Sequence, residues 1–318
     1  MTFSEIIVVV LGLVLFETIS SIDNAVVNAD VLATMSQKAR RWFLTYGLII
    51  AVFVVRGLMP LLIVYLSNPA LGLGGAVTAT FSSNPSVRRA IEAQKPILLA
   101  GGGMYLVLLF LHWIFIEMKE YAFFLERHVH QRFSVWFYAS ASIVLLVTVW
   151  LTMRHNPMIA FGTVVGSTAF FITNGFKKNA EEKERQLTHG SHLSDVSKIL
   201  YLEVLDAAFS IDGVLGAFAF TLSVPLILLG NGLGAYVVRS FTVRGIKTVK
   251  KYCYLKNGAM YSVASLGVIM LAESLGARIP AWLPTVITFA VVGLFLWLSA
   301  HKLKIDGKAL ESAKKIPG

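Results

Sequence analysis

The chain has 318 residues, of which 56% are hydrophobic and only 14% are charged, and its mean hydropathy is +0.70. Soluble chains carry about 25% charged residues, so this composition excludes an ordinary soluble domain and indicates a membrane protein surrounded by a lipid bilayer. The net charge of +10 does not indicate nucleic-acid binding, because the basic residues lie in short loops between apolar runs. A single cysteine, Cys253, excludes an internal disulfide and a multi-thiolate metal site.

Apolar runs recur along the whole chain, and several reach the roughly 20 residues that cross a bilayer. They predict an all-α, polytopic transmembrane helical bundle of about nine spans, with residues 1–318 forming a single integral membrane domain. In chain order the predicted spans are 6–34, 43–66, 97–116, 135–153, 157–174, 199–222, 225–243, 258–272 and 284–300.

Lysine and arginine alternate between successive loops of this plan. The intervening loops are poor in basic residues, whereas 21 of the 28 in the chain lie in five segments, 36–42, 117–134, 175–198, 244–257 and the tail from 301. Basic loops stay on the cytoplasmic side of a membrane. We therefore expect the N-terminus outside, the C-terminus in the cytoplasm and a cytoplasmic loop at 175–198, in a bacterial cytoplasmic membrane.

An acidic motif interrupts the first span and occurs again in the sixth. Its residues in the first span are Glu17, Ser21, Asp23 and Asn24, and the same spacing returns as Asp206, Ser210, Asp212 and Gly213. A charged side chain near the bilayer centre costs roughly 3 kcal/mol, so acids within spans predict a functional site. Because Gly213 stands where the first motif has Asn24, the second motif offers one fewer side-chain oxygen.

Two further signatures recur with the motif. V-V-R ends at Arg56 in the second span and at Arg239 in the seventh, and G-G-M-Y at 102–105 returns as G-A-M-Y at 258–261. The predicted topology reverses the chain direction between the copies. Spans 1–3, about 5–116, and spans 6–8, about 199–272, are therefore predicted to be inverted repeats, a plan of transporters whose sites lie near the bilayer midplane.

The paired motif and the Gly-Gly-x-Tyr third span resemble the TerC family, named for tellurium resistance, within the LysE superfamily of exporters. The stretch L-E-V-L-D-A-A-F-S-I-D-G in the second half looks most like a TerC-like branch described as a domain of unknown function. The resemblance covers about residues 5 to 300. Members of these families are implicated in exporting manganese and in some cases calcium. The resemblance therefore implies an exporter of divalent cations, with manganese favoured over calcium and with ligands from both motif helices.

The motif side chains have the chemistry that such a site needs. Four carboxylates carry a charge of −4 and suit a hard dication that binds through oxygen. On an unbroken helix Glu17 and Asp23 would point about 120° apart, so we expect the helix to break at Ser20-Ser21. A proton relay and a purely structural set of ion pairs are the alternatives. The predicted metal ligands are Glu17, Asp23, Asn24, Asp206 and Asp212, with Ser21 and Ser210 as neutral donors.

Two arginines within spans are expected to compensate this negative charge. Arg56, well inside its span, is predicted to pair with a motif carboxylate when no metal is bound. Arg239 is nearer the cytoplasmic end, so it either acts in the same way or reaches the headgroups. Asn231 either lines the path or packs between helices. Glu203 is expected to be hydrated at the cytoplasmic side.

The remaining chemistry-bearing residues do not indicate an enzyme. His112 is predicted to bond to a neighbouring helix, and His189 and His192 to lie in a solvated linker. The chain has no helical zinc motif, nucleophile elbow or Walker loop, so neither enzyme activity nor a cofactor is expected. Two other functions stay open, a basic amino-acid exporter and a membrane-bound interaction protein in stress or tellurium resistance.

Overall fold

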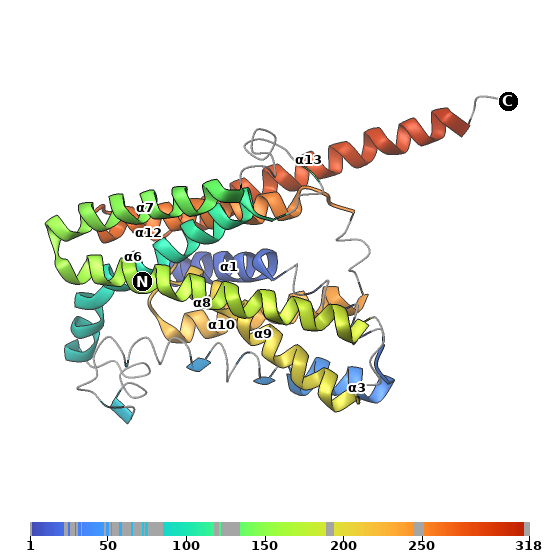
Figure 1. The fold of residues 1–318 in the computed structure, drawn as a ribbon, viewed down its shortest axis with the longest axis horizontal. Coiled ribbons are helices and arrows are strands. Elements are labelled where there is room, and N and C mark those ends of the chain that lie inside the picture. Colours follow the sequence, from blue (N-terminus) through green and yellow to red (C-terminus); the bar gives the residue numbers. More distant parts are fainter. Residues whose placement is uncertain are drawn as a thin grey trace.

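The structure is a computed structural model whose described part covers most of the chain. It describes the single positions and short stretches 25, 29, 52, 57–58, 65, 72, 74–75 and 121 together with residues 2–21, 31–32, 34–47, 49–50, 85–117, 134–188, 194–244 and 251–314. Every regular element among these residues is a helix (Figure 1). The elements are α1 (Phe3–Ser20), α3 (Gln37–Trp42), the π-helix η1 (Phe43–Gly47), α6 (Pro85–Phe115), α7 (Ser134–His155), α8 (Pro157–Thr188), α9 (Asp195–Ala217), α10 (Val224–Arg244), α12 (Leu255–Ser274) and α13 (Leu283–Lys314).

Six helices in the described part are long and apolar enough to cross a membrane: Phe3–Ser20, Ala93–Phe115, Val135–His155, Pro157–Lys177, Leu255–Ser274 and Leu283–Ile305. They fall on the predicted spans 1, 3, 4, 5, 8 and 9. The sixth predicted span corresponds to α9, which is more polar than the six helices above. The seventh corresponds to α10, whose apolar part is the shorter stretch Val224–Ser240. The described part is therefore all-helical, and the chain is an integral membrane protein. The predicted second span, 43–66, lies largely outside the described residues, so nine spans and the inverted repeats stay predictions.

Local sequence explains where the helices begin and end. Thr2 and Glu5 form a capping box at the start of α1, and the Ser194 side chain accepts from the Ser197 amide at the start of α9. The segment 175–198, which we expected to be a loop, instead contains the last turns of α8 and the first of α9. Hydropathy shows where the apolar run ends, but it does not show where the helix ends. Residues such as Ala, Glu and Lys beyond the apolar run still favour helix.

α1 runs through the middle of the bundle (Figure 1) and packs on α9 and α10. Its register with α10 is parallel, because Gly230 faces Leu13 and Gly234 faces Glu17 one turn later. Its register with α9 is antiparallel, because Phe16 lies at Gly216 and Glu17 lies at Gly213. Both motif helices are thus direct neighbours that run in opposite directions.

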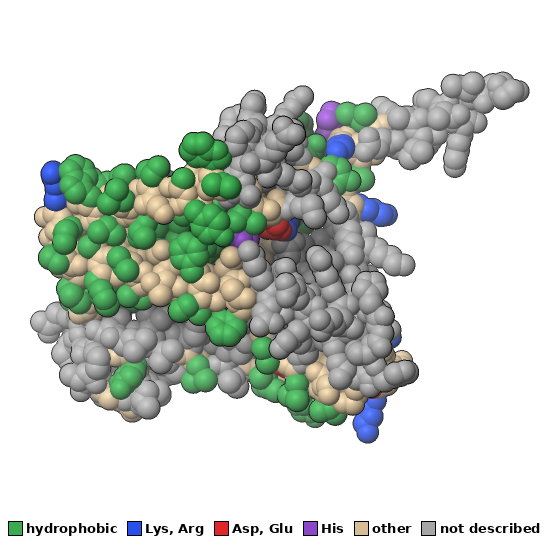
Figure 2. Space-filling view, viewed as in Figure 1, with side chains coloured by type: hydrophobic (Ala, Val, Ile, Leu, Met, Phe, Trp, Pro, Cys, Tyr) green, Lys and Arg blue, Asp and Glu red, His purple; other side chains and the backbone are tan. Residues whose placement is uncertain are grey.

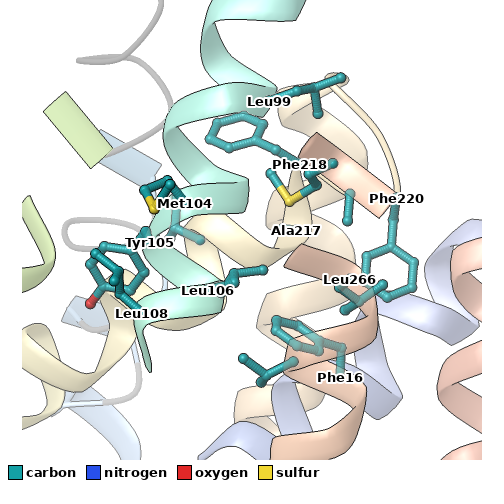
Figure 3. Close-up of a cluster of buried hydrophobic side chains, with 14 of the residues drawn as sticks. Phe16, Leu99, Met104, Tyr105, Leu106, Leu108, Ala217, Phe218, Phe220 and Leu266 are labelled. Carbon is teal, nitrogen blue, oxygen red and sulfur yellow. The ribbon is translucent and has the colours of Figure 1, made fainter. Parts of the chain in front are cut away.

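The apolar core joins α1, α6, α9 and α12. Figure 3 shows Phe16 on α1 and Phe220 after α9 beside Leu266 on α12. The ring centroids of the two phenylalanines lie 5.8 Å apart. The core extends along α6 through Met104 and Leu106, which are fully buried. Burial of these side chains holds the motif helices against α6 and α12 and so fixes the surroundings of the motif acids.

Glycines allow α6 to approach two neighbouring helices closely, as small residues do in membrane bundles. On one side a Cβ at Gly103 would lie 2.9 Å from the Gly267 carbonyl oxygen of α12. On the other side a Cβ at Gly101 would lie 2.9 Å from the Gly162 carbonyl oxygen of α8, and one at Gly166 would collide with the Gly101 carbonyl. The backbones of α6 and α8 are therefore in direct contact.

Replacing Gly166 by Ala is expected to destabilise the protein, because the new methyl group meets backbone that cannot rotate away. Overpacking of this kind costs about 1–3 kcal/mol. The measurement is the thermal unfolding midpoint in detergent. Gly175→Ala in the same helix is the matched control, since a Cβ there meets nothing within 4 Å, and it should leave the midpoint unchanged or raise it. Equal midpoints for the two variants would contradict the close contact.

The α6 and α12 pair is antiparallel, and an ion pair joins the helices near each end. Lys95 pairs with Glu273, and about twenty residues away along the pair Lys256 pairs with Glu117. Each side chain is partly exposed. The two ends of this helix pair therefore carry the same type of contact, in keeping with the repeated signatures on α6 and α12.

Hydrophobic side chains cover the described outer surface of α7 and α8. Figure 2 shows them spread over the face that these helices form, with lysine and arginine side chains toward the margins. Trp136, Leu146 and Trp150 on α7 are more than half exposed, as are Phe161 and Phe176 on α8. A surface of this composition contacts lipid rather than water.

Candidate functional site

Glu17 of the first motif is completely buried, with an exposed fraction of 0%. α1 ends three residues later at Ser20, where the sequence predicted a break. The Ser21 hydroxyl donates to Glu17 Oε1 at 3.0 Å. The spacing of four residues places Ser21, predicted to be a neutral donor, on the same helix face as Glu17, so that its hydroxyl bonds a motif carboxylate.

Glycines of two other helices make room for the Glu17 side chain. A Cβ at Gly213 of the second motif would collide with Glu17 Oε2, and a Cβ at Gly234 of α10 would lie 2.6 Å from Glu17 Cβ. Gly213 is the position where the second motif departs from the first. The departure has a steric reason, because the carboxylate of one motif occupies the space that a side chain of the other would fill.

Asp212, the neighbour of Gly213, lies in a group of polar side chains from three helices that we call the Asp212 cluster: Tyr105, Thr173, Lys177 and Asp212. The Tyr105 hydroxyl donates to Asp212 Oδ1, and the Lys177 ammonium pairs with Oδ2. Tyr105 Oη also lies 2.9 Å from Thr173 Oγ1, one turn before Lys177 on α8. Both oxygens of the Asp212 carboxylate therefore have donors, and one of these donors is a cation.

Asp206 lies in a second group, the Arg239 cluster: Phe43, Glu203, Asp206 and Arg239. Arg239 Nη2 is 3.8 Å from Asp206 Oδ2 and 3.8 Å from Glu203 Oε1. Its Nη1 donates to the Phe43 carbonyl, and its guanidinium carbon lies 4.3 Å from the centre of the Phe43 ring. Arg239 is 8% exposed. It therefore pairs with carboxylates inside the bundle and does not reach out to the lipid headgroups. Glu203, which we expected to be hydrated, lies beside it with its side chain only 12% exposed.

The two acids of the second motif have different neighbours because α9 continues without a break from Asp195 to Ala217. Six residues on a regular helix turn the side chain direction by about 120° from Asp206 to Asp212. Asp206 accordingly faces α10, whereas Asp212 faces α6 and α8. Glu17 lies beside the Asp212 end of the motif, at Gly213.

Within the described residues, no three His, Cys, Asp or Glu side chains form a group that could hold a metal ion. Three predicted site residues, Asp23, Asn24 and Arg56, lie outside those residues, and the Ser210 side chain is not described. A site with four carboxylates therefore stays a prediction. Its described acids, Glu17, Asp206 and Asp212, all come from neighbouring parts of α1 and α9.

The histidines add no ligands to these clusters in the described part of the chain. The His112 ring packs edge-on against Phe137, with centroids 5.5 Å apart, and also against Phe170. That environment suits the predicted contact with neighbouring helices. His189 and His192 lie outside the described residues.

Sequence reasoning missed the importance of Lys177, Tyr105 and Thr173. Tyr105 belongs to the recurring G-G-x-Y signature, so its recurrence was a signal. Lys177 follows the predicted end of the fifth span by three residues and was counted among the loop charges. Its spacing of four from Thr173 places both side chains on one face of a helix that continues past the apolar run.

A family model described as "Protein of unknown function (DUF475)" matches residues 22–305. The chain belongs to the DUF475 family. The matched range contains the second motif and all residues of both clusters, whereas Glu17 and Ser21 precede it. No curated protein and no solved structure matches this DUF475 chain. The family description names no activity, so the resemblance to TerC proteins and the function it implies stay predictions.

Proposed function

We propose that this DUF475 protein is a secondary-type transporter that exports a divalent metal cation, manganese in preference to calcium, through carboxylates of both motifs. One observation carries the proposal. The Glu17 carboxylate of the first motif lies against Gly213 of the second, next to Asp212. Two acidic motifs that are almost two hundred residues apart in sequence thus meet inside a bundle of apolar helices.

Burial of this many acids favours a functional rather than a structural role. Carboxylates inside a bundle are costly even when they are paired, and apolar side chains of similar volume would pack there at lower cost. Asn231 adds to this: it is fully buried on α10, and neither of its side-chain polar atoms has a hydrogen-bond partner in the described part. Buried amides normally have partners. Its oxygen is of the type that binds hard cations, and it lies three residues from Gly234 on the same helix.

The ion pairs at the two ends of α6 and α12 fit a transporter that opens to one side at a time. Lys95 with Glu273 and Lys256 with Glu117 each join the same two helices, at opposite ends. In the predicted topology the first pair is external and the second cytoplasmic. Alternating access requires that contacts of this kind break at one end while they hold at the other.

A basic amino-acid exporter is the second candidate, and the Lys177 contact favours it. Asp212 already holds a primary ammonium group in the bundle, and Tyr105 bonds the other oxygen of its carboxylate. The same carboxylate would bind the ammonium of a basic amino acid. Such a substrate also carries a carboxylate and a long side chain, and the acids Glu17, Glu203 and Asp206 would repel the carboxylate.

Flux into proteoliposomes containing the purified protein tests the two candidates directly. Radioactive manganese, calcium and lysine are offered in parallel, with protein-free liposomes as the control. We expect manganese to be carried fastest, calcium more slowly and lysine at the background rate. Lysine flux without manganese or calcium flux would replace the proposal by the second candidate, and no flux of any of the three would favour an interaction protein.

A further inference from the structure

The cation of the Asp212 cluster is the ammonium group of a lysine, whereas that of the Arg239 cluster is the guanidinium group of an arginine. Lys177 comes from the C-terminal part of α8, and its side chain, 11% exposed, reaches the Asp212 carboxylate. Tyr105 bonds the other oxygen. An incoming cation that binds Asp212 through both oxygens must therefore first displace an ammonium group that is tethered to the protein.

We propose that Lys177 determines the charge of the substrate, because it is a tethered monovalent competitor for Asp212 that dications displace and monovalent ions do not. The inference rests on the proposed transport function and deepens it by naming the property that selects the substrate. Lys177 is then a specificity-determining residue of the transporter.

The selection follows from simple electrostatics. The interaction energy with a carboxylate scales with the charge of the cation. A sodium or potassium ion that replaces the ammonium loses hydration and gains no charge. A dication loses more hydration, but it doubles the attraction to Asp212 and to every other carboxylate of the proposed site. The tether adds to the barrier, because an intramolecular partner has an effective concentration in the millimolar range or above. Monovalent ions therefore compete poorly with Lys177.

The side chains around the pair suit an exchange of this kind. Lysine has a flexible four-carbon stem and a compact ammonium group, so it can withdraw without moving its helix. Tyr105 is also held by Thr173 on α8, so the hydroxyl that orients Asp212 keeps a partner when Lys177 leaves. Return of the ammonium group then displaces the dication, which makes binding reversible as transport requires.

The first test compares manganese binding to the purified wild-type protein and to Lys177→Gln, in buffers where sodium replaces choline at constant ionic strength. In the wild type, sodium should leave manganese affinity unchanged. The variant should bind manganese at least about tenfold more tightly in choline, since one close positive charge is gone, and sodium should now weaken that binding. Lys198→Gln is the matched control, because Lys198 is also buried but donates to Thr34.

Each outcome of this comparison decides something different. Wild-type affinity in Lys177→Gln, with no effect of sodium, would overturn the role of Lys177 and leave the transport proposal intact. A wild-type protein that binds no dication would remove both. A purely structural ion pair predicts lower stability in Lys177→Gln with no change in the discrimination between sodium and manganese.

A second test uses the wild-type protein and so does not depend on the folding of a variant. Lysine residues are reductively methylated with and without manganese, and the modified positions are identified by mass spectrometry. Manganese should increase the methylation rate of Lys177 severalfold, because the ammonium is released from Asp212, and should leave Lys198 unchanged. Equal rates for Lys177 in the two conditions would overturn the inference.

Discussion

Asp212→Asn is expected to abolish dication flux, with a loss of at least about a hundredfold, while the protein still inserts into the membrane. Asparagine keeps the volume and the oxygen that accepts from Tyr105, but it lacks the charge that a hard cation needs in a ligand. Removing one member of a buried charged pair costs about 2–5 kcal/mol in binding, and a hundredfold loss corresponds to about 2.8 kcal/mol within that range. The measurement is initial manganese flux at matched protein content.

The same substitution leaves Lys177 without its carboxylate partner, so its effect on stability must be separated from its effect on transport. The double variant Lys177→Gln/Asp212→Asn has no uncompensated charge at this pair and should recover stability without recovering flux. Glu5→Gln is a control on the exposed end of α1, where glutamine still serves in the capping box. Normal flux in Asp212→Asn would show that the Asp212 carboxylate does not bind the substrate.

Most of the helices could be predicted from the sequence because a bilayer imposes a simple requirement. An apolar run of span length has to be helical to satisfy its backbone hydrogen bonds in lipid. That reasoning located six helices of the described part. The predicted bounds are close to the observed ones for α7 and α12, whereas α1 ends earlier and α13 ends later than predicted. Hydropathy is less informative for α9, where motif acids and other charged residues lower it. It is also less informative for the end of α8, where the helix continues beyond the apolar run.

The motif acids could be found from the sequence, but their partners could not. A repeated acidic pattern is visible in one dimension, whereas the pairing of Asp212 with Lys177 depends on how α8 packs against α9. Backbone contact at Gly101 and Gly166 sets the position of α8 against α6. Such a register comes from steric fit between glycines, and nothing in the composition of a single helix specifies it.

Gly213 shows how structure changes the meaning of a sequence difference. In the sequence, Gly213 is the position at which the second motif lacks the side-chain oxygen that Asn24 offers in the first motif. In the fold it is the contact surface for Glu17 Oε2, where any larger side chain would collide. The asymmetry between the motifs therefore follows from their contact, because one copy supplies the buried carboxylate and the other supplies the space beside the helix backbone.

Arg239→Gln is expected to destabilise the protein by about 3–5 kcal/mol, the usual cost of removing one partner from a buried set of charges. Arg239 lies between two carboxylates, at 3.8 Å from each, and its guanidinium also bonds the Phe43 carbonyl. Without it Glu203 and Asp206 face each other as like charges inside the bundle. The checking measurement is chemical or thermal unfolding in detergent.

Two further variants identify the cause of that loss. Glu203→Gln added to Arg239→Gln should restore part of the stability, because one of the two unpaired negative charges disappears and the pair of substitutions is then coupled. Arg239→Lys should not restore it, since a single ammonium group cannot meet both carboxylates and the Phe43 carbonyl in the geometry of a planar guanidinium.

Arg154→Gln is the matched control for the arginine. Arg154 is exposed at the end of α7, where its guanidinium carbon lies 4.1 Å from the centre of the Trp150 ring, and a cation–π contact at such a site contributes about 0.5–1 kcal/mol. If Arg239→Gln cost no more than Arg154→Gln, the charges of Glu203 and Asp206 would have to be compensated without Arg239. In that case Arg239 would not be what stabilises the buried acids of the Arg239 cluster, and the assignment of Lys177 to Asp212 and of Arg239 to Asp206 as compensating charges would fail for Asp206.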